Sequence, residues 1–213
     1  EQEMLYEFCA ENVTLLEKAM QEGARRIELC DNLTVGGTTP SYGVIQAAVE
    51  LAKSYDTTVM TMIRPRGGDF VYSDLEVSIM LEDLKKAREA GSQGLVYGLL
   101  TKENELDKAN LERLLAASQG LEVVFHMAFD AIPKDKQFAA LDWLAEHGVK
   151  RILTHGGSAS ETIQEHFGWL KELVDYAGDR IEILPGGGIT TENRNEIVEK
   201  LGVSQLHGTK VVF

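Results

Sequence analysis

The sequence predicts a (β/α)8 barrel of the TIM type, a closed ring of eight parallel strands surrounded by helices. Three observations favour this fold. Short apolar runs alternate with amphipathic stretches along all 213 residues, and alternating strands and helices pair in parallel through right-handed crossovers. Eight such strands can be placed. Glycines, histidines and charged residues gather after the strands, as they do at the C-terminal mouth of a barrel.

The expected strands are short runs in which apolar residues are continuous or alternate with polar ones. They lie at residues 4–9, 25–30, 58–64, 94–98, 121–126, 150–154, 180–185 and 204–207. Helices with an apolar face are expected between them, at residues 12–22, 42–54, 74–90, 107–118, 135–146, 161–177 and 191–201. The chain runs six residues past the last strand, so we expect the eighth helix to be missing.

An open, doubly wound sheet is the main alternative, because it shows the same alternation of strand and helix. No GxGxxG motif follows the first strand, which makes this fold the weaker interpretation. The turns after the helices are short and glycine-containing, as in Glu22-Gly23-Ala24 and His147-Gly148-Val149, and look like helix C-caps. The unusual residues therefore lie at one end of the strands, as a barrel requires.

Composition limits the class of protein. At 44% hydrophobic and 26% charged residues, the chain is typical of a globular protein, and we expect one domain over residues 1–213. It shows no apolar run of membrane-spanning length and no secretory leader, so we expect a cytoplasmic protein. The formal net charge of -13 would repel nucleic acids and anionic membranes, so neither is an expected partner.

The first two strands carry the two cysteines of the chain. A period of two along strand 25–30 turns Glu28 and Cys30 into the barrel, and the same period along strand 4–9 turns Glu7 and Cys9 inward. Both strands then present a carboxylate below a thiol, and two thiols at matching heights could share one Cu(I) or Zn(II) ion. Equally, both cysteines could be small buried hydrophobes. A disulfide is not expected in an intracellular protein.

Two arginines follow the third strand, within MIRPRGGDF. Arg64 shares a face with Met60 and Met62, and Arg66 lies on the loop that Gly67-Gly68 makes flexible. Arginines at a glycine turn can grip a carboxylate or a phosphate in a bidentate manner. For Arg64 we favour a structural function, an ion pair with a carboxylate on strand 1 or strand 2. Arg66 remains a candidate anion-binding residue.

Three histidines end strands: His126, His155 and His207. Imidazoles at one mouth could supply acid–base chemistry or metal ligands, and Asp130 lies four residues after His126. Histidines at such positions also act as plain hydrogen-bonding spacers. His126 is the strongest candidate for a chemical function, whereas His166 is expected to face solvent from a helix.

A glycine run, Pro185-Gly186-Gly187-Gly188, follows the seventh strand and leads into Ile189-Thr190-Thr191. Exposed amides and a helix N-terminus favour anions, and barrels commonly bind phosphate with the loops after strands 7 and 8. Lys210, after the eighth strand, would add a cation. Gly187, Gly188 and Lys210 are therefore candidate anion-binding residues, although a glycine run is also a simple turn.

The motifs found along the chain resemble those of the CutC family of copper homeostasis proteins. They cover nearly the whole sequence in the same order: EFCAEN, ELCDNLTVGGTTPSYG, MIRPRGGDFVYS, FHMAFD, RILTHGG, PGGGIT and LHGTK. The resemblance implies a TIM barrel and a link to copper tolerance. It also implies Cu(I) binding through the cysteines that match Cys9 and Cys30, and so favours a metal site over a plain apolar pair.

Two functions follow as hypotheses. The first is a cytoplasmic copper homeostasis protein that binds Cu(I), its copper cofactor, at Cys9 and Cys30. The alternative is an enzyme acting on a small phosphorylated or carboxylated metabolite at the same mouth. Its catalytic candidates are Glu28, His126, Arg64 and Asp130, and its anion-binding candidates are Arg66, Gly187, Gly188 and Lys210. Missing its eighth helix, the barrel is also expected to form a homo-oligomer or to be covered by a loop.

Overall fold

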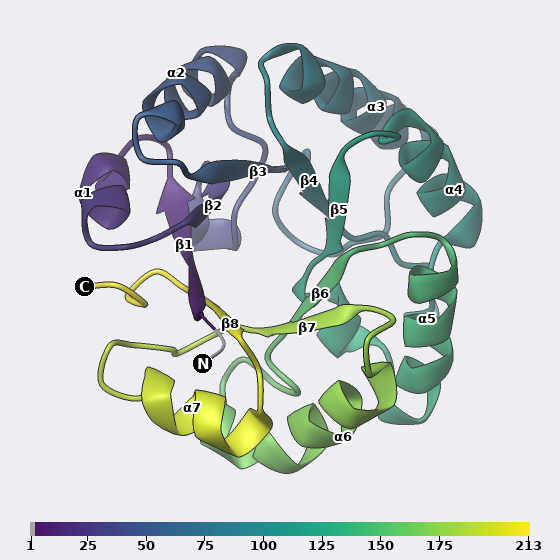
Figure 1. Cartoon of the computed structure of the whole chain (residues 1–213). Helices are drawn as coiled ribbons and strands as arrows, with labels where there is room; N and C mark the ends of the chain where they lie inside the picture. Colours follow the sequence, from purple (N-terminus) through teal and green to yellow (C-terminus); the bar gives the residue numbers. More distant parts are fainter. Residues whose placement is uncertain (1–2) are drawn as a thin grey trace.

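Parallel strands form a ring around a central axis, viewed end-on in Figure 1. The structure is a computed structural model that describes residues 3–213. Each strand pairs in parallel with the next from β1 to β7, and β8 pairs with the free side of β1. The predicted (β/α)8 TIM-type barrel is confirmed. The strands are β1 (Leu5–Glu11), β2 (Arg26–Cys30), β3 (Thr58–Met62), β4 (Gly94–Tyr97), β5 (Glu122–Phe125), β6 (Arg151–Thr154), β7 (Glu182–Pro185) and β8 (Gln205–Gly208).

Side chains join β7 to β8. These two strands lie in contact, but within residues 3–213 no backbone ladder connects them. Instead Gln205 Nε2 donates a hydrogen bond of 2.6 Å to Glu182 Oε2, and Arg26 Nη2 donates one of 2.7 Å to Gln205 Oε1. A chain of partly buried polar side chains thus links β7, β8 and β2 near the N-terminal ends of the strands.

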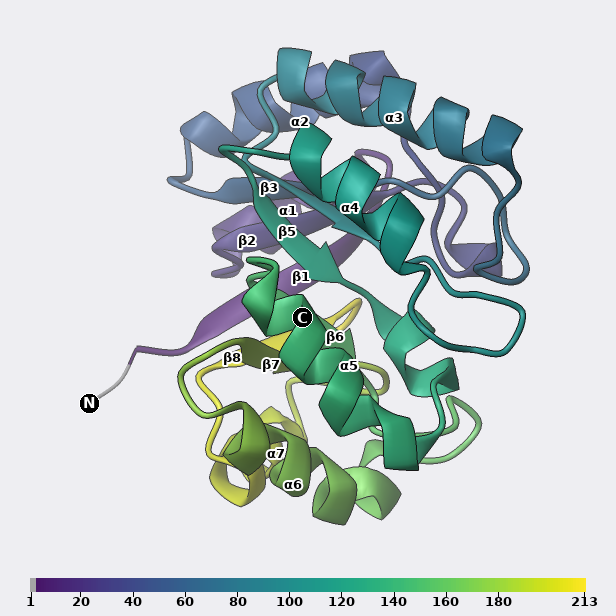
Figure 2. The same ribbon diagram turned by 90° about the vertical axis from the view of Figure 1, so that its right-hand side faces the viewer.

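Helices cover the outside of the ring, as Figures 1 and 2 show. Within residues 3–213 they are α1 (Leu16–Gln21), α2 (Tyr42–Lys53), α3 (Asp74–Glu89), α4 (Lys108–Ala117), α5 (Lys134–Glu146), α6 (Phe167–Ala177) and α7 (Arg194–Leu201), with short 3-10 turns η1 (Leu33–Val35), η2 (Met127–Ala131) and η3 (Ile163–His166). Local sequence fixes several starts. Ser73, for example, caps α3 by accepting from the Glu76 amide while Glu76 accepts from the Ser73 amide, a capping box.

The first helix is shorter than predicted. The sequence analysis places it at residues 12–22, but β1 continues to Glu11, which pairs with Cys30. Asn12 and Leu15 then adopt left-handed backbone conformations, with φ of 57° and 58°. A right-handed helix cannot run through such residues, so α1 begins only at Leu16.

No helix follows β8 within the described residues, as expected, and the last residues pack against the barrel instead. Val211 and Val212 are buried, and the Phe213 ring lies 5.6 Å from the Phe8 ring, centroid to centroid. Arg194 Nη1 donates to the Val211 carbonyl over 2.8 Å. This segment is the covering loop that the sequence analysis offered as one alternative, and a homo-oligomer remains a prediction.

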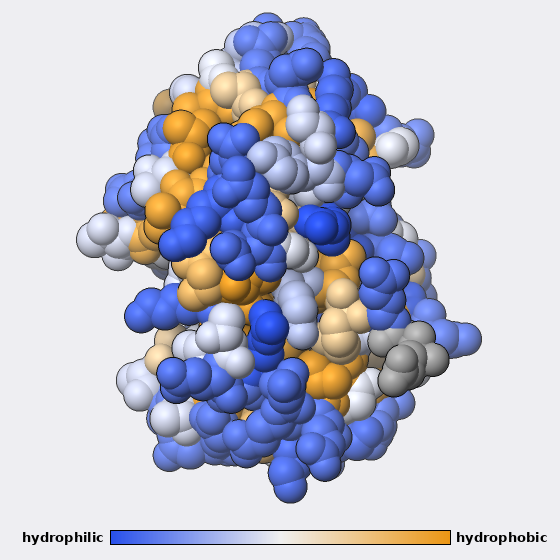
Figure 3. Space-filling view, turned by 60° about the vertical axis from the view of Figure 1, so that its left-hand side comes forward, coloured by the Kyte–Doolittle hydropathy of each residue, from blue (hydrophilic) through white to orange (hydrophobic). Residues whose placement is uncertain are grey.

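Figure 3 shows the face on the left-hand side of Figure 1. Apolar side chains are exposed there between polar ones.

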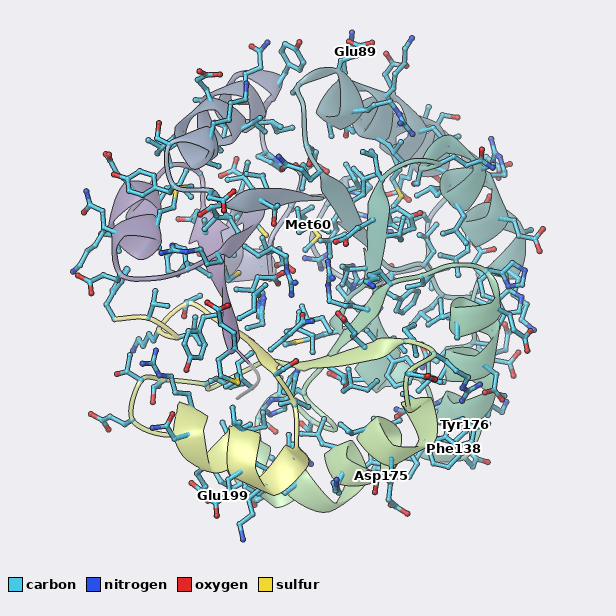
Figure 4. All side chains as sticks on the ribbon, in the orientation of Figure 1. Met60, Glu89, Phe138, Asp175, Tyr176 and Glu199 are labelled. Carbon is cyan, nitrogen blue, oxygen red and sulfur yellow. The ribbon has the colours of Figure 1, made fainter. Side chains whose placement is uncertain are left out.

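The barrel interior is divided into a charged lower layer and a largely apolar upper one. Arg151 donates to Glu122 over 2.6 Å and to Glu182 over 3.4 Å, which fills the end where the strands begin. Above this layer lies a small buried cluster from alternate strand positions: Cys9, Cys30, Met60, Met62, Val96, Val124, Leu153 and Leu184. Figure 4 shows Met60 inside the ring. The cysteines therefore lie at the floor of the C-terminal mouth.

Candidate functional site

A cavity of about 600 Å³ opens at the C-terminal mouth of the barrel. Its floor carries Cys9, Glu28 and His207, and its walls come from the loops that follow the strands. Of the residues predicted as functional, seven line this cavity: Cys9, Glu28, Arg64, His126, Gly187, Gly188 and Lys210. Residues far apart in the chain thus gather around one opening, as a parallel barrel requires.

The two thiols meet at the Glu28 carboxyl group. Cys30 Sγ lies 3.4 Å from Glu28 Oε1, and Cys9 Sγ lies 3.7 Å from the same oxygen. One donor atom from each of these three residues can be chosen so that all lie within 4.8 Å of one another. Both cysteines are free and buried. The sulfurs therefore point to the same side of the sheet.

The expected register of the two strands was wrong. The thiols were expected at matching heights, but the ladder pairs Cys9 with Glu28 and Glu11 with Cys30. Closing a barrel requires such a stagger between neighbouring strands, and the shear cannot be seen in either strand alone. Cys30 consequently lies level with Glu11, two residues closer to the C-terminal mouth than Cys9. The two sulfurs therefore lie diagonally from each other, and both are close to Glu28 Oε1.

The two thiols differ in acidity. The pKa of Cys9 is lowered from 9.0 to about 5, chiefly by a hydrogen bond from Cys30, while burial opposes the shift and His207 adds to it. The same hydrogen bond and burial raise the pKa of Cys30 well above 9.0. Burial raises the pKa of Glu28 from 4.5 to about 8. At neutral pH the cluster therefore holds a thiolate at Cys9 and a thiol at Cys30, and burial disfavours the charged form of Glu28.

Positive charge lies directly below the thiols. His207 Nδ1 is 2.7 Å from Glu7 Oε1, and Arg26 forms an ion pair with the other oxygen of Glu7. Burial alone would lower the pKa of His207, but Glu28, Cys9 and Glu7 overcome it and raise the pKa well above 6.5. A protonated His207 therefore stabilises the Cys9 thiolate. The sequence analysis gave His207 no specific function, placed Glu7 inside the barrel without assigning it these partners, and did not single out Arg26.

The donor set fits a soft monovalent cation. Two sulfur atoms face each other, and thiolate sulfur is the ligand type that Cu(I) prefers. Glu28 Oε2 is buried without a hydrogen-bond partner among residues 3–213. A buried polar atom left unpaired is destabilising, and a cation at this position would satisfy it. The cluster of Cys9, Glu28 and Cys30 can therefore hold a metal ion without a change of fold.

Arg64 makes different contacts from those expected. The sequence analysis favoured an ion pair with a carboxylate on β1 or β2, but Arg26 occupies that place. Arg64 instead donates to the carbonyls of Val35 at 2.6 Å, Gly37 at 3.0 Å and Gly68 at 2.9 Å. Its guanidinium ties the loop after β2 to the loop after β3 and so shapes one wall of the cavity.

Arg66 and Asp130 do not line the cavity. Arg66 pairs with Glu76 at 2.5 Å and with Asp69 at 3.2 Å. Asp130 accepts hydrogen bonds from Thr154 Oγ1 and, at 2.9 Å, from the His155 amide. Its carboxylate thereby fixes the end of β6. Both residues support the loops around the mouth rather than facing its interior.

His126 lines the cavity as an imidazole whose tautomer is fixed. The Ala128 amide donates to His126 Nδ1 over 3.1 Å, so any ring proton of the neutral form lies on Nε2. His126 Nε2 is buried and has no partner among residues 3–213. Burial, with a smaller effect of Arg64, lowers the pKa of His126 from 6.5 to about 3. The side chain is therefore a neutral hydrogen-bond donor.

His155 and His166 hold loops through hydrogen bonds to backbone carbonyls. His155 places its two ring nitrogens 2.8 Å from the carbonyls of Gly186 and Glu161. His166 was expected to face solvent, which is wrong. It is buried, with Nε2 3.2 Å from the Ser158 carbonyl oxygen, because the predicted helix starts with the 3-10 turn η3, which turns this ring toward the loop after β6.

The glycine run after β7 forms the opposite wall. Gly187 and Gly188 have positive φ angles of 90° and 79°, and a Cβ at Gly187 would lie 2.5 Å from His155 Nδ1. Glycine is therefore required there by both backbone and space. Asn193 holds the loop, accepting from the Thr190 amide over 2.8 Å and donating to the Gly188 carbonyl over 2.9 Å. Lys210 lines the cavity beside it.

Relatives of the chain match nearly its whole length. The family model described as CutC matches residues 4–212. A CutC family protein from Enterococcus faecalis is 54% identical over 98% of this chain and 100% of its own length. A copper homeostasis protein cutC homolog from Mus musculus is 43% identical over 95% of this chain and 72% of its own length.

A solved structure agrees with the fold. The crystal structure of a CutC protein from Streptococcus agalactiae is 52% identical, covers 98% of this chain and 99% of its own, and superposes with a TM-score of 0.95. The family model, over residues 4–212, includes every strand that carries a residue of the cavity. The chain belongs to the CutC family.

Proposed function

We propose that this protein acts in copper homeostasis and binds Cu(I) through Cys9 and Cys30. The observation that carries the proposal is the cluster in which both sulfurs and the Glu28 carboxyl group lie within 4.8 Å of one another. The copper homeostasis name of its 43% identical relative supports the same function. These are the only two cysteines in the sequence, so no other thiol pair competes for the ion.

The cluster favours Cu(I) binding over a plain apolar contact. With a pKa of about 5, Cys9 is already a thiolate at pH 7, while Cys30 remains a thiol. Two-thiolate binding therefore displaces the Cys30 proton, so each Cu(I) bound should release about one proton at pH 7. His207 and Arg26 place positive charge below the resulting pair of thiolates, which offsets their mutual repulsion.

The mouth provides the route for the ion. Cys9 lines the open cavity, whereas Cys30 is fully buried behind it. An incoming ion would meet Cys9 first and then Cys30. This order suits a protein that receives Cu(I) from a carrier and hands it on, because thiolates exchange the ion one ligand at a time. A reducing cytoplasm, which keeps both thiols free, is part of this proposal.

Competition with the chelator bicinchoninate, under anaerobic conditions, tests this function. We expect one Cu(I) per chain and an affinity that falls about a hundredfold in the double variant Cys9→Ser, Cys30→Ser. Met60→Leu is the matched control, because it removes a buried sulfur of the same cluster that contacts Arg151. If the double variant binds Cu(I) as tightly as the wild type, the thiol pair is not the site.

The test uses the whole chain, and the double variant must be shown to fold. Within residues 3–213, no helix is long and apolar enough to span a bilayer. Circular dichroism shows whether the double variant keeps its secondary structure. If it does, a lost affinity for Cu(I) reflects the missing sulfurs and not unfolding. A variant that is folded and binds less than one Cu(I) per chain would support the proposal.

A further inference from the structure

The cavity is much larger than a metal site. Its volume of about 600 Å³ falls within the range of about 300–1,000 Å³ typical of small-molecule pockets. Above Cys9 and Glu28, much of its wall is apolar: Leu33, Val35, Met62, Phe70, Met127 and Leu153. A bound Cu(I) ion would fill only the floor and leave these side chains facing an open space.

Two buried N–H groups on one side of the cavity have no partner. His126 is 5% exposed and its Nε2 is unpaired among residues 3–213. Arg64 is also 5% exposed, and although its terminal nitrogens bind carbonyls, its Nε is likewise unpaired. Both side chains pack on Phe70, with the His126 ring 5.1 Å and the Arg64 guanidinium 5.2 Å from its ring centroid. Unpaired buried donors are rare because they are destabilising.

The neutral form of His126 gives this side of the cavity a defined chemistry. Its Nδ1 already accepts from the Ala128 amide, so Nε2 can only donate. A donor of this kind binds an acceptor oxygen such as a carbonyl or a hydroxyl group. The low pKa of His126, about 3, keeps the ring uncharged at neutral pH.

The facing wall offers groups that bind an anion. The amides of Gly187 and Gly188 have no hydrogen-bond partner among the described residues. Lys210 is exposed at the rim and makes no ion pair with any residue in 3–213. The Lys210 ammonium group is therefore available to a ligand at the mouth of the cavity. Free amides and a cation together bind phosphate or carboxylate.

We propose that the cavity binds a small organic anion that has an acceptor oxygen at a distance from its acidic group. The phosphate or carboxylate lies against Gly187, Gly188 and Lys210. The apolar body lies between Met62, Phe70 and Leu153, and the acceptor oxygen receives a hydrogen bond from His126 Nε2. This ligand is separate from Cu(I), and its binding does not depend on the thiol function.

Truncated probes test the proposal on the full chain without copper. The complete probe is 4-oxopentyl phosphate, whose flexible chain carries a ketone and a phosphate. Pentyl phosphate lacks the ketone, 2-pentanone lacks the phosphate, and 5-oxohexanoate replaces the phosphate by a carboxylate. Binding is followed by NMR through the amides of Gly187 and Gly188 and the ring nitrogens of His126.

We expect saturable binding of 4-oxopentyl phosphate at concentrations below about 10 mM, a weak affinity normal for a small ligand. Omitting the ketone should weaken binding about fivefold, equal to one ordinary hydrogen bond. His126→Met, which has no hydrogen-bond donor, should remove that difference between the two phosphates, provided that its melting temperature shows a folded chain. Comparing 5-oxohexanoate with the phosphate identifies the acidic group that the rim prefers.

Lys210→Ala keeps the test decisive even if His126→Met does not fold, because Lys210 is exposed. It should weaken binding of both phosphates about tenfold and leave 2-pentanone unchanged. Lys200→Ala, on the exposed side of α7, is the matched control and should have no effect. The proposal is overturned if neither acidic ketone binds below about 10 mM, or if Lys210→Ala and Lys200→Ala behave alike.

Discussion

Glu7 and His207 lie 200 positions apart in the chain, yet His207 Nδ1 and Glu7 Oε1 are separated by 2.7 Å inside the barrel. Arg26 pairs with the second oxygen of the same carboxylate. These contacts connect β8 to β1 and β1 to β2, so one buried carboxylate joins the last strand to the first two. They also fix the charge below the thiols of the site.

Replacing Glu7 by Gln should destabilise the protein by about 3 kcal/mol at pH 7, because it leaves the buried charges of Arg26 and His207 without their partner. Urea unfolding followed by circular dichroism measures the change. Glu50→Gln is the control, since Glu50 pairs with Lys53 on the exposed face of α2. Equal stabilities of the two variants would contradict this account.

The Glu7 contribution should also depend on pH. Burial raises its pKa, but Arg26 and His207 prevail and lower it from 4.5 to about 2. A carboxyl group whose pKa falls on folding stabilises the folded state above its unfolded pKa, and this stabilisation is lost as the pH falls through the folded pKa. The difference between wild type and Glu7→Gln should therefore be full above about pH 4.5 and shrink between pH 4.5 and pH 2.

Cys9 should ionise far below an ordinary cysteine. Its pKa of about 5 rests first on the hydrogen bond from Cys30, so Cys30→Ala should raise it toward 9.0. The thiolate absorbance near 240 nm, followed against pH, reports this ionisation. Cys9→Ser should lose the step near pH 5 altogether. A wild-type step that stays near pH 9 would show that Cys9 is an ordinary buried thiol.

His126 should remain neutral throughout the range in which most histidines titrate. With a pKa of about 3, its ring nitrogen shifts should not change between pH 8 and pH 5. The unprotonated nitrogen should be Nδ1, which accepts from the Ala128 amide. His147, which is exposed, provides the internal comparison. A midpoint above pH 5 for His126 would contradict its burial as a neutral donor.

Replacing Arg64 by Met should loosen the mouth. The change removes hydrogen bonds to three carbonyls in two loops, which we expect to destabilise the fold by about 3 kcal/mol. Amide exchange should accelerate at residues 35–37 and 68. Arg113→Met is the control, because Arg113 is exposed and donates to Asn110 on its own helix, so the variant should lose at most about 0.5 kcal/mol. Similar losses in the two variants would argue against a bracing function for Arg64.

The alternation of strand and helix predicted the barrel and most element boundaries to within two residues, the exceptions being the starts of α1, α6 and α7. The inward positions of Cys9, Glu28 and Cys30 also followed from the period of two, because side-chain direction along a strand is a local property. Glycines after β7 marked the loop that lines the cavity. The start of α1 was predicted too early. Apolar periodicity does not reveal that Asn12 and Leu15 adopt left-handed conformations, which delay the helix to Leu16.

Contacts between strands could not be predicted in this way. Arg26 and Arg64 both follow or lie on strands next to the carboxylates of the barrel. The stagger of the strands places Arg26, and not Arg64, beside Glu7. The same stagger sets Cys9 opposite Glu28 and brings His207 beneath the thiols.

The sequence by itself therefore determined which side chains face the interior, while the tertiary structure decided which of them touch. The physical reason is that side-chain direction repeats every two residues within one strand, whereas the register between strands is set by closing the whole ring.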